Sequence, residues 1–143
     1  MKRIRVAGIV KIEDKFALIH RTNVKDNSCH NYYAFPGGGL EEESKEEGTI
    51  REIKEELGID VKIVELLYTF YGETMDEYFY LCEYVSGKFG TGDGPEFDKN
   101  AEYEHRGEYT PVLVSKEKVE ELLILPPQAK EVFVNDIKKG KFQ

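Results

Sequence analysis

Three glutamates close together in the sequence have the type and spacing of a metal site. Glu52, Glu55 and Glu56 lie three and four residues apart, so a helix brings them to one side. Carboxylate oxygens beside a glycine turn are hard ligands, and no Cys or His lies among them. The residues therefore predict Mg²⁺ or Mn²⁺ rather than Zn²⁺. At this point a merely solvated helix face remains the alternative.

The surrounding segment is unusually acidic. Residues 37–59 read GGGLEEESKEEGTIREIKEELGI, with eight glutamates against one arginine and two lysines, a local net charge of −5 out of −8 for the chain. Like charges three or four residues apart destabilise a helix by roughly 0.2–0.5 kcal/mol per pair. Either this face is exposed to solvent, or a cation is held there.

The helix that carries these glutamates has clear boundaries. Ser44 with Glu47 three residues later forms a capping-box pattern, and Gly58 is a typical helix stop. Ile53 and Leu57 fall on a stripe opposite to the glutamates, at about 100° per residue. We therefore predict a helix from Ser44 to Gly58 with one core-facing side and one acidic side.

The rest of the chain alternates strands with helices, which predicts an α/β sandwich on a mixed sheet. Two segments are predicted as irregular: a polar turn at Thr22–Asn31 and a long loop at Ser86–Gly107. Two further helices are expected, Lys116–Leu123 after Ser115 and a last one from Pro126-Pro127 to about Lys138. The expected strands are Arg3–Ile12, Phe16–His20, Tyr32–Phe35, Val61–Tyr71, Glu77–Val85 and Glu108–Val114.

Length and charge limit the classes of function. A chain of 143 residues is expected to form one domain, residues 1–143. A net charge of −8 argues against a nucleic-acid polymer or an anionic membrane as the main partner, but not against a small phosphorylated ligand. Cys29 and Cys82 are isolated, and no apolar run reaches membrane-spanning length, so a cytoplasmic protein is expected.

The order of residues in the acidic segment is more specific than its composition. Gly37, five residues, Glu43, seven residues and then 51–59, REIKEELGI, resembles the complete Nudix box. Nudix hydrolases cleave nucleoside diphosphates linked to another moiety, and their fold is an α/β/α sandwich. One departure is that 41–43 read EEE without the glycine common in the family, so the loop before the helix is one residue shorter.

The resemblance implies a site and a mechanism. Carried over by position, Glu52, Glu55 and Glu56 are the metal ligands, with the carbonyl of Gly37 as a further oxygen. Such a cation neutralises phosphate charge and activates a water, and Glu52 could also act as the base. A small nucleoside diphosphate derivative is the implied partner, either a nucleoside triphosphate or a nucleotide sugar. Monomer and homodimer both stay open.

Two further catalytic roles follow from the resemblance. Arg51 would pair with a glutamate and hold its carboxylate in position, unless it forms only a surface ion pair. The family often takes another glutamate from a distant loop, as a metal ligand or general base. Glu96 is the first candidate here, followed by Glu102 and Glu104.

Two other classes of protein share the fold that the resemblance implies. A catalytically silent Nudix module would bind a nucleotide as a sensor, but such modules usually lose box residues that are present here. Isopentenyl-diphosphate isomerases use a Cys and a Glu, and Cys29 offers a candidate thiol. Those enzymes depart from the glycine-rich box that this chain keeps, which favours the hydrolase.

Overall fold

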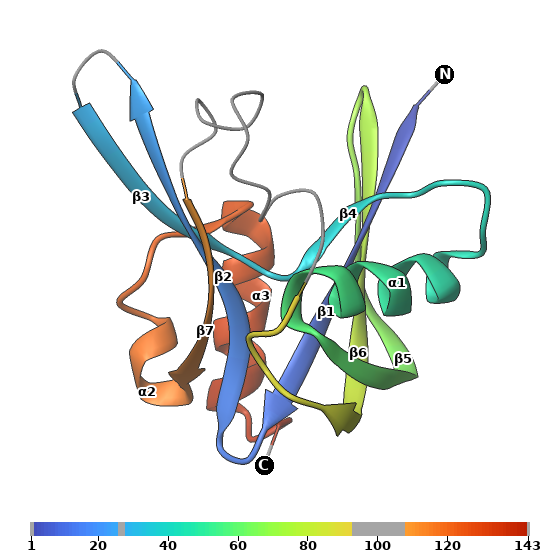
Figure 1. Ribbon diagram of the computed structural model, residues 1–143. Helices are drawn as coiled ribbons and strands as arrows, with labels where there is room; N and C mark the ends of the chain where they lie inside the picture. The colour runs from blue at the N-terminus through green and yellow to red at the C-terminus, as the bar shows by residue number, and fades with distance from the viewer. Residues whose placement is uncertain (1, 26–27, 93–107, 143) are drawn as a thin grey trace.

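The computed structural model describes residues 2–25, 28–92 and 108–142. Glu96, Glu102 and Glu104 therefore lie outside the described residues. Figure 1 shows the strands and helices. They are β1 Arg3–Ile12, β2 Lys15–Lys25, β3 Ser28–Ala34, β4 Gly37–Gly39, α1 Lys45–Leu57, β5 Ile59–Tyr71, β6 Met75–Gly87, β7 Glu108–Ser115, α2 Lys116–Val119, β8 Ile124–Leu125 and α3 Pro127–Lys138.

The strands form one mixed sheet in the order β5-β6-β1-β2-β3-β8, with β4 paired to β1 and β7 paired to β2. Strand β1 is parallel to β6, and β3 is parallel to β8, whereas the other pairs are antiparallel. The β1–β2 hairpin pairs only at its turn, where Lys11 faces Phe16 and Ile12 faces Lys15. Beyond the turn the two strands diverge, because β4 pairs with β1 while β7 pairs with β2 (Figure 1).

Helices cover both faces of the sheet, so the predicted α/β sandwich is confirmed (Figure 1). On one face, Ile53 and Leu57 of α1 are fully buried in a cluster with Ile19 of β2. On the other face, Phe133 of α3 lies edge-on to Phe16, with ring centroids 4.9 Å apart, in an aromatic core. Such pairs add about 0.5–1.5 kcal/mol to the stabilisation that burial of the rings already provides.

The turn predicted at Thr22–Asn31 is wrong. Strands β2 and β3 continue through most of it, with Thr22 opposite Asn31 and Val24 opposite Cys29. Backbone pairing does not depend on the polarity of the side chains, so a polar hairpin end can continue the ladder. The expected helix Lys116–Leu123 is also too long, because α2 ends at Val119. The short strands β4 and β8 were not predicted.

Membrane crossing finds no support in the helices. Within residues 2–25, 28–92 and 108–142, no helix is long and apolar enough to span a bilayer.

Cys82 is a buried free thiol on β6, and burial raises its pKa to about 12. It is therefore protonated at neutral pH and packs as a small apolar side chain.

Candidate active site

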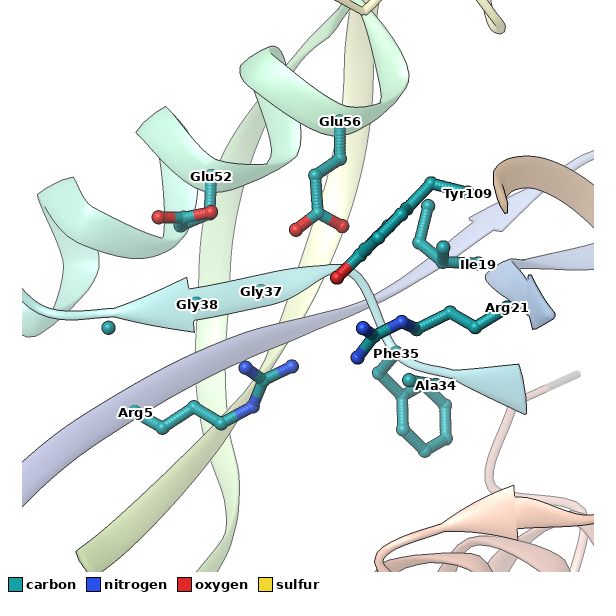
Figure 2. Close-up of a pocket in the computed structure, with 11 residues that line it drawn as sticks. Arg5, Ile19, Arg21, Ala34, Phe35, Gly37, Gly38, Glu52, Glu56 and Tyr109 are labelled. Carbon is teal, nitrogen blue, oxygen red and sulfur yellow. The ribbon is translucent and has the colours of Figure 1, made fainter. Parts of the chain in front are cut away.

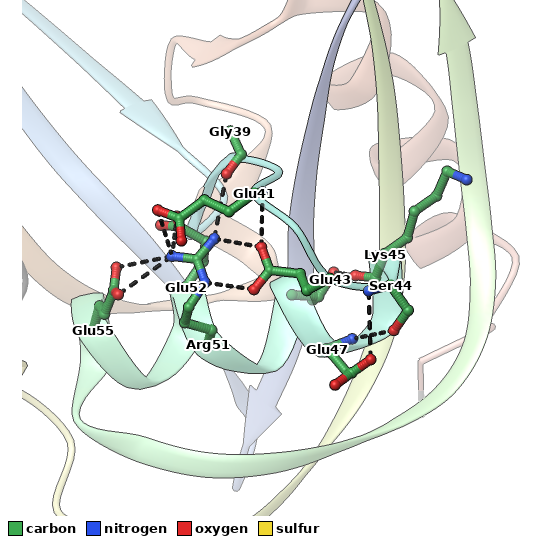
Figure 3. A network of polar contacts seen from close by, with 10 residues as sticks. Gly39, Glu41, Glu43, Ser44, Lys45, Glu47, Arg51, Glu52 and Glu55 are labelled. Atoms are coloured by element: carbon green, nitrogen blue, oxygen red, sulfur yellow. Dashed lines mark hydrogen bonds and ion pairs between the residues drawn. The ribbon is translucent and has the colours of Figure 1, made fainter.

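Helix α1 begins and ends as its sequence predicts. The Ser44 hydroxyl accepts a hydrogen bond from the backbone N–H of Glu47 at 3.1 Å, and the Ser44 N–H donates to the Glu47 carboxylate at 3.4 Å (Figure 3). Gly58 ends the helix in the left-handed region, with φ of 78°. This reciprocal cap fixes where the helix starts, and therefore which glutamates face β4.

Arg51 gathers three carboxylates around one guanidinium. Its Nε donates to Glu43 Oε1 at 2.8 Å and its Nη2 to Glu43 Oε2 at 2.9 Å, a two-point contact. Its Nη1 donates to Glu52 Oε1 at 3.0 Å and to Glu55 Oε1 at 3.3 Å. We call Arg51 with Glu43, Glu52 and Glu55 the Arg51 cluster (Figure 3). The expected pairing of Arg51 with a glutamate is therefore seen: it hydrogen-bonds to these three, and a fourth, Glu41, lies 3.9 Å from its Nη1.

The Arg51 cluster is electrostatically matched. Hydrogen bonds from Arg51, and then one from the backbone N–H of Glu41, lower the pKa of Glu43 to about 2. The same contact with Glu43 raises the pKa of Arg51 further above its usual value. The loop before the helix is one residue short of the common pattern, yet it still seats Glu43 on Arg51. Glu43 contacts Arg51 and the Glu41 backbone and does not line the pocket.

A pocket of about 250 Å³ opens between α1 and β4 and reaches the diverging strands of the sheet (Figure 2). Glu52 and Glu56 enter it from α1, and their residues are only 8% and 6% exposed. Strand β4 supplies Gly37, so the structure brings three of the four expected ligands to this pocket. Glu55 does not line the pocket. Its side chain is 30% exposed and contacts Arg51.

The glycines of β4 let this strand approach α1 closely. A Cβ atom at Gly38 would lie 2.6 Å from the Glu52 carboxyl carbon, whereas one at Gly39 would meet no atom within 4 Å. The space that Gly38 leaves is therefore filled by the Glu52 carboxylate. An alanine there would have to displace the carboxylate or the strand.

The donor chemistry of this site fits a hard divalent cation. The carboxylates of Glu52 and Glu56 and the backbone of Gly37 provide oxygen only, as Mg²⁺ and Mn²⁺ prefer. In the parts of the chain that the structure covers, no three His, Cys, Asp or Glu side chains are already gathered around one metal position. The fit thus rests on the type of oxygen that lines the pocket beside β4. The Glu55 side chain would have to turn away from Arg51 to become a further metal ligand.

Sequence reasoning missed three polar residues of the pocket: Arg5 on β1, Arg21 on β2 and Tyr109 on β7. A signal for the two arginines was present. Arg21 lies two residues beyond Ile19, on the strand face that also carries the buried Ala17, and Arg5 lies on the same face of its strand as the buried Ala7. A charged residue at a position that alternation assigns to the core marks a candidate site. Tyr109 carried no such signal, because aromatic residues are common in strands.

Comparisons with known proteins agree with this geometry. Residues 1–127 match the family described as NUDIX domain. An ADP-ribose pyrophosphatase of Methanocaldococcus jannaschii is 32% identical over 97 residues, which cover 63% of this chain and 56% of that protein. The chain thus spans little more than half the length of this curated relative.

Solved structures show the same fold. A NUDIX hydrolase from Nitrosomonas europaea has a TM-score of 0.69 at 19% identity, covering 99% of this chain and 91% of that one. A MutT protein from Methanosarcina mazei Go1 has a TM-score of 0.63 at 23% identity, covering 99% and 96%. A UDP-X diphosphatase has a TM-score of 0.67 at 17% identity, covering 99% and 64%. Because the family match extends over residues 1–127 of 143, the chain belongs to the NUDIX domain family.

Proposed function

We propose that this chain is a divalent-metal-dependent hydrolase of a nucleoside diphosphate linked to another moiety, and that it cleaves a pyrophosphate bond by attack of water. The observation that carries the proposal is the pair of buried carboxylates, Glu52 and Glu56, beside the glycine strand β4 in one pocket. Burying two carboxylates next to each other is costly unless a cation compensates them. The residues 1–143 would act as a single domain.

The residues have separate tasks in this proposal. Glu52, Glu56 and the Gly37 carbonyl would hold Mg²⁺ or Mn²⁺, with Glu55 as a further ligand. A cation there supplies positive charge against the diphosphate and makes water more acidic. Arg51 keeps the Glu52 carboxylate in one orientation through the 3.0 Å contact to Oε1, and Glu43 in turn fixes the guanidinium plane. Glu52 accepts the proton of the attacking water, a role that Glu96 could share from outside the described residues.

ADP-ribose is the first substrate to test, because the relative with 32% identity is an ADP-ribose pyrophosphatase. Other nucleotide sugars, ordinary and oxidised nucleoside triphosphates and dinucleoside polyphosphates complete the panel. The partner is a small molecule in every case, and no nucleic-acid polymer or membrane is invoked. We expect the enzyme to act as a monomer or a homodimer in the cytoplasm.

The experiment is a product analysis with Mg²⁺ or Mn²⁺, repeated with EDTA. We expect at least one compound to be split at a pyrophosphate bond, only in the presence of metal. In ¹⁸O-labelled water the label should appear on one phosphorus atom, which identifies the atom attacked. If every compound stays intact while the protein binds one of them tightly, the chain is a silent nucleotide-binding module and the proposal is wrong.

A further inference from the structure

Exposed apolar side chains gather on the strand pair β5–β6, away from the pocket (Figure 1). Of six exposed large apolar residues in the described parts of the chain, five belong to these two strands: Val64, Leu66, Tyr71, Tyr84 and Val85. Strand β5 ends the sheet order, and within the described ranges no strand pairs with its outer side. An edge strand that carries exposed apolar side chains is a surface to which another strand can add.

A bulge in β5 places Lys62 and Glu65 on the same face of the sheet. On a regular strand, two residues three positions apart point to opposite faces. In the ladder with β6, Lys62 lies opposite Glu83. The register then skips Val64, and Glu65 lies opposite Leu81. Because Glu83 and Leu81 are two residues apart on β6, Lys62 and Glu65 opposite them share a face.

The same bulge brings two apolar residues together on the other face. Val61 lies opposite Tyr84, and Leu66 lies opposite Tyr80. These tyrosines are four residues apart on β6, so Val61 and Leu66 share the face on which Val61 and Tyr80 pack with helix α1. Leu66 is still 47% exposed. Residues 61–66 thus carry a pair of opposite charges on one face and an apolar pair on the other.

This segment is complementary to a second copy of itself. Opposite residues of an antiparallel ladder lie on the same face, and a two-fold axis makes every such pair occur twice. An axis between positions 63 and 64 places Lys62 of each copy opposite Glu65 of the other, and Val61 opposite Leu66. A bulge on one strand alone disturbs an edge. Here both copies carry it at the same place, so the ladder stays in register.

The two charged residues are available for such contacts. Glu65 is exposed and has no ion pair within 4.0 Å in the described ranges. Lys62 lies 3.2 Å from Glu83, but both side chains are more than half exposed. An exposed ion pair of this kind contributes little, so Lys62 can exchange it for a new partner at low cost.

We propose that residues 61–66 of β5 form a self-association surface, through which two copies of this chain join their sheets edge to edge. The inference is independent of the proposed function, because this edge does not line the pocket. The contact involves one short strand segment on each side and is small, so we expect a dissociation constant in the micromolar range.

The test is sedimentation equilibrium of the full chain over a series of concentrations. Lys62→Glu and Glu65→Lys each replace both attractive pairs by repulsive ones, and each should raise the dissociation constant of the dimer at least tenfold. The double variant Lys62→Glu/Glu65→Lys restores two attractive pairs and should restore the dimer. Lys139→Glu and Glu131→Lys change the net charge equally at exposed positions in or next to α3, and should associate as the unaltered protein does.

Mixing the two single variants separates a lost contact from a damaged fold. The Lys62→Glu variant carries two negative charges at these positions and the Glu65→Lys variant two positive ones. A mixed dimer therefore has two attractive pairs, whereas each variant alone has two repulsive pairs. We expect the mixture to form dimers at concentrations at which neither variant alone does. A mixture that stays monomeric there contradicts the proposal.

Hydrogen exchange locates the contact. Exchange of the backbone amides in residues 61–66 should slow as the concentration of the unaltered protein rises, and should not slow in Glu65→Lys. Two other results would overturn the proposal. An unaltered protein that stays monomeric at millimolar concentration does not associate through this edge. A dimer whose dissociation constant is unchanged by both single reversals forms through a different surface.

Discussion

The glutamates of one acidic segment serve two regions with opposite electrostatics. In the Arg51 cluster, Glu43 meets its cation within the chain, through two hydrogen bonds of 2.8 and 2.9 Å. In the pocket, Glu56 is 94% buried and faces glycine backbone and two arginines on the far wall. Glu52 belongs to both regions, since it lines the pocket and accepts from Arg51. Whether a carboxylate has a structural role or a binding role therefore depends on the groups that it contacts, and not on its position in the sequence.

The largest effect is expected from Glu56→Gln, which keeps the size of the side chain and removes its charge. We expect turnover to fall about a thousandfold or more, because transition-state charge stabilisation by the metal is lost. The free energy of unfolding of the metal-free protein should stay unchanged or rise by about 0.2–0.5 kcal/mol, since like-charge repulsion is relieved. Steady-state kinetics and urea unfolding measure the two effects.

Two controls accompany Glu56→Gln. Glu46→Gln changes an exposed glutamate at the start of the same helix and should keep most activity. Glu55→Gln changes a carboxylate that contacts Arg51, so we expect a smaller loss than at Glu56. If all three variants lose activity alike, the helix face is simply a solvated surface and the division into two regions is wrong.

Gly38→Ala and Gly39→Ala form a matched pair on β4. The Cβ atom at position 38 would lie 2.6 Å from the Glu52 carboxyl carbon, and the one at 39 would contact nothing within 4 Å. We expect Gly38→Ala to reduce kcat about a hundredfold by displacing Glu52, with Gly39→Ala close to the unaltered protein. Similar kinetics for the two variants would show that the Glu52 position is not critical.

Metal addition should act on the pocket and not on the Arg51 cluster. Mn²⁺ at about one hundred times its dissociation constant should raise the free energy of unfolding by about 2.7 kcal/mol, because it binds only the folded state. The same addition to Glu56→Gln should give little or no increase in Tm. An equal increase in both proteins places the metal elsewhere.

The smallest expected effect concerns Glu43 and depends on pH. Because its pKa is lowered from 4.5 to about 2 in the fold, ionised Glu43 stabilises the protein above pH 4.5, and this contribution disappears as pH falls toward 2. We expect Glu43→Gln to lose about 1 kcal/mol at neutral pH, since the pair is partly exposed. Urea unfolding at neutral and acidic pH should show the difference shrinking with acid. Glu42→Gln, at an exposed neighbour, should show no such trend.

The sequence predicted the position of helix α1 well, for physical reasons that are local. Ser44, Glu47 and Gly58 act within one or two turns, so their spacing is enough to place α1 and its glutamates. The spacing did not show that Glu55 would turn to Arg51 while Glu56 enters the pocket. That division depends on how closely β4 approaches the helix, which no local pattern reports.

The other wall of the pocket depends on long-range pairing. Arg5 and Arg21 come from the two consecutive strands of a hairpin, whereas Tyr109 comes from β7, far away in the sequence. The three residues line one pocket because β1 and β2 diverge and β7 pairs with β2. The register of such pairs follows from packing of the whole sheet. Without it, each arginine can be marked as a charged residue on a strand face that also carries buried residues, but the sequence does not show that the two arginines line one pocket.

The divergence of β1 and β2 has a consequence for substrate length. The hairpin is closed at Lys11 and Phe16, where Phe16 is fixed in the aromatic core beneath α3, and it is open toward Arg5 and Arg21. A small change in the angle between β1 and β2 at the closed end therefore causes a larger change in the distance between them at the open end. We expect replacement of Phe16 by a smaller apolar residue to change the width of the pocket and, with it, the substrate with the highest kcat/KM in the panel, although Phe16 does not line the pocket.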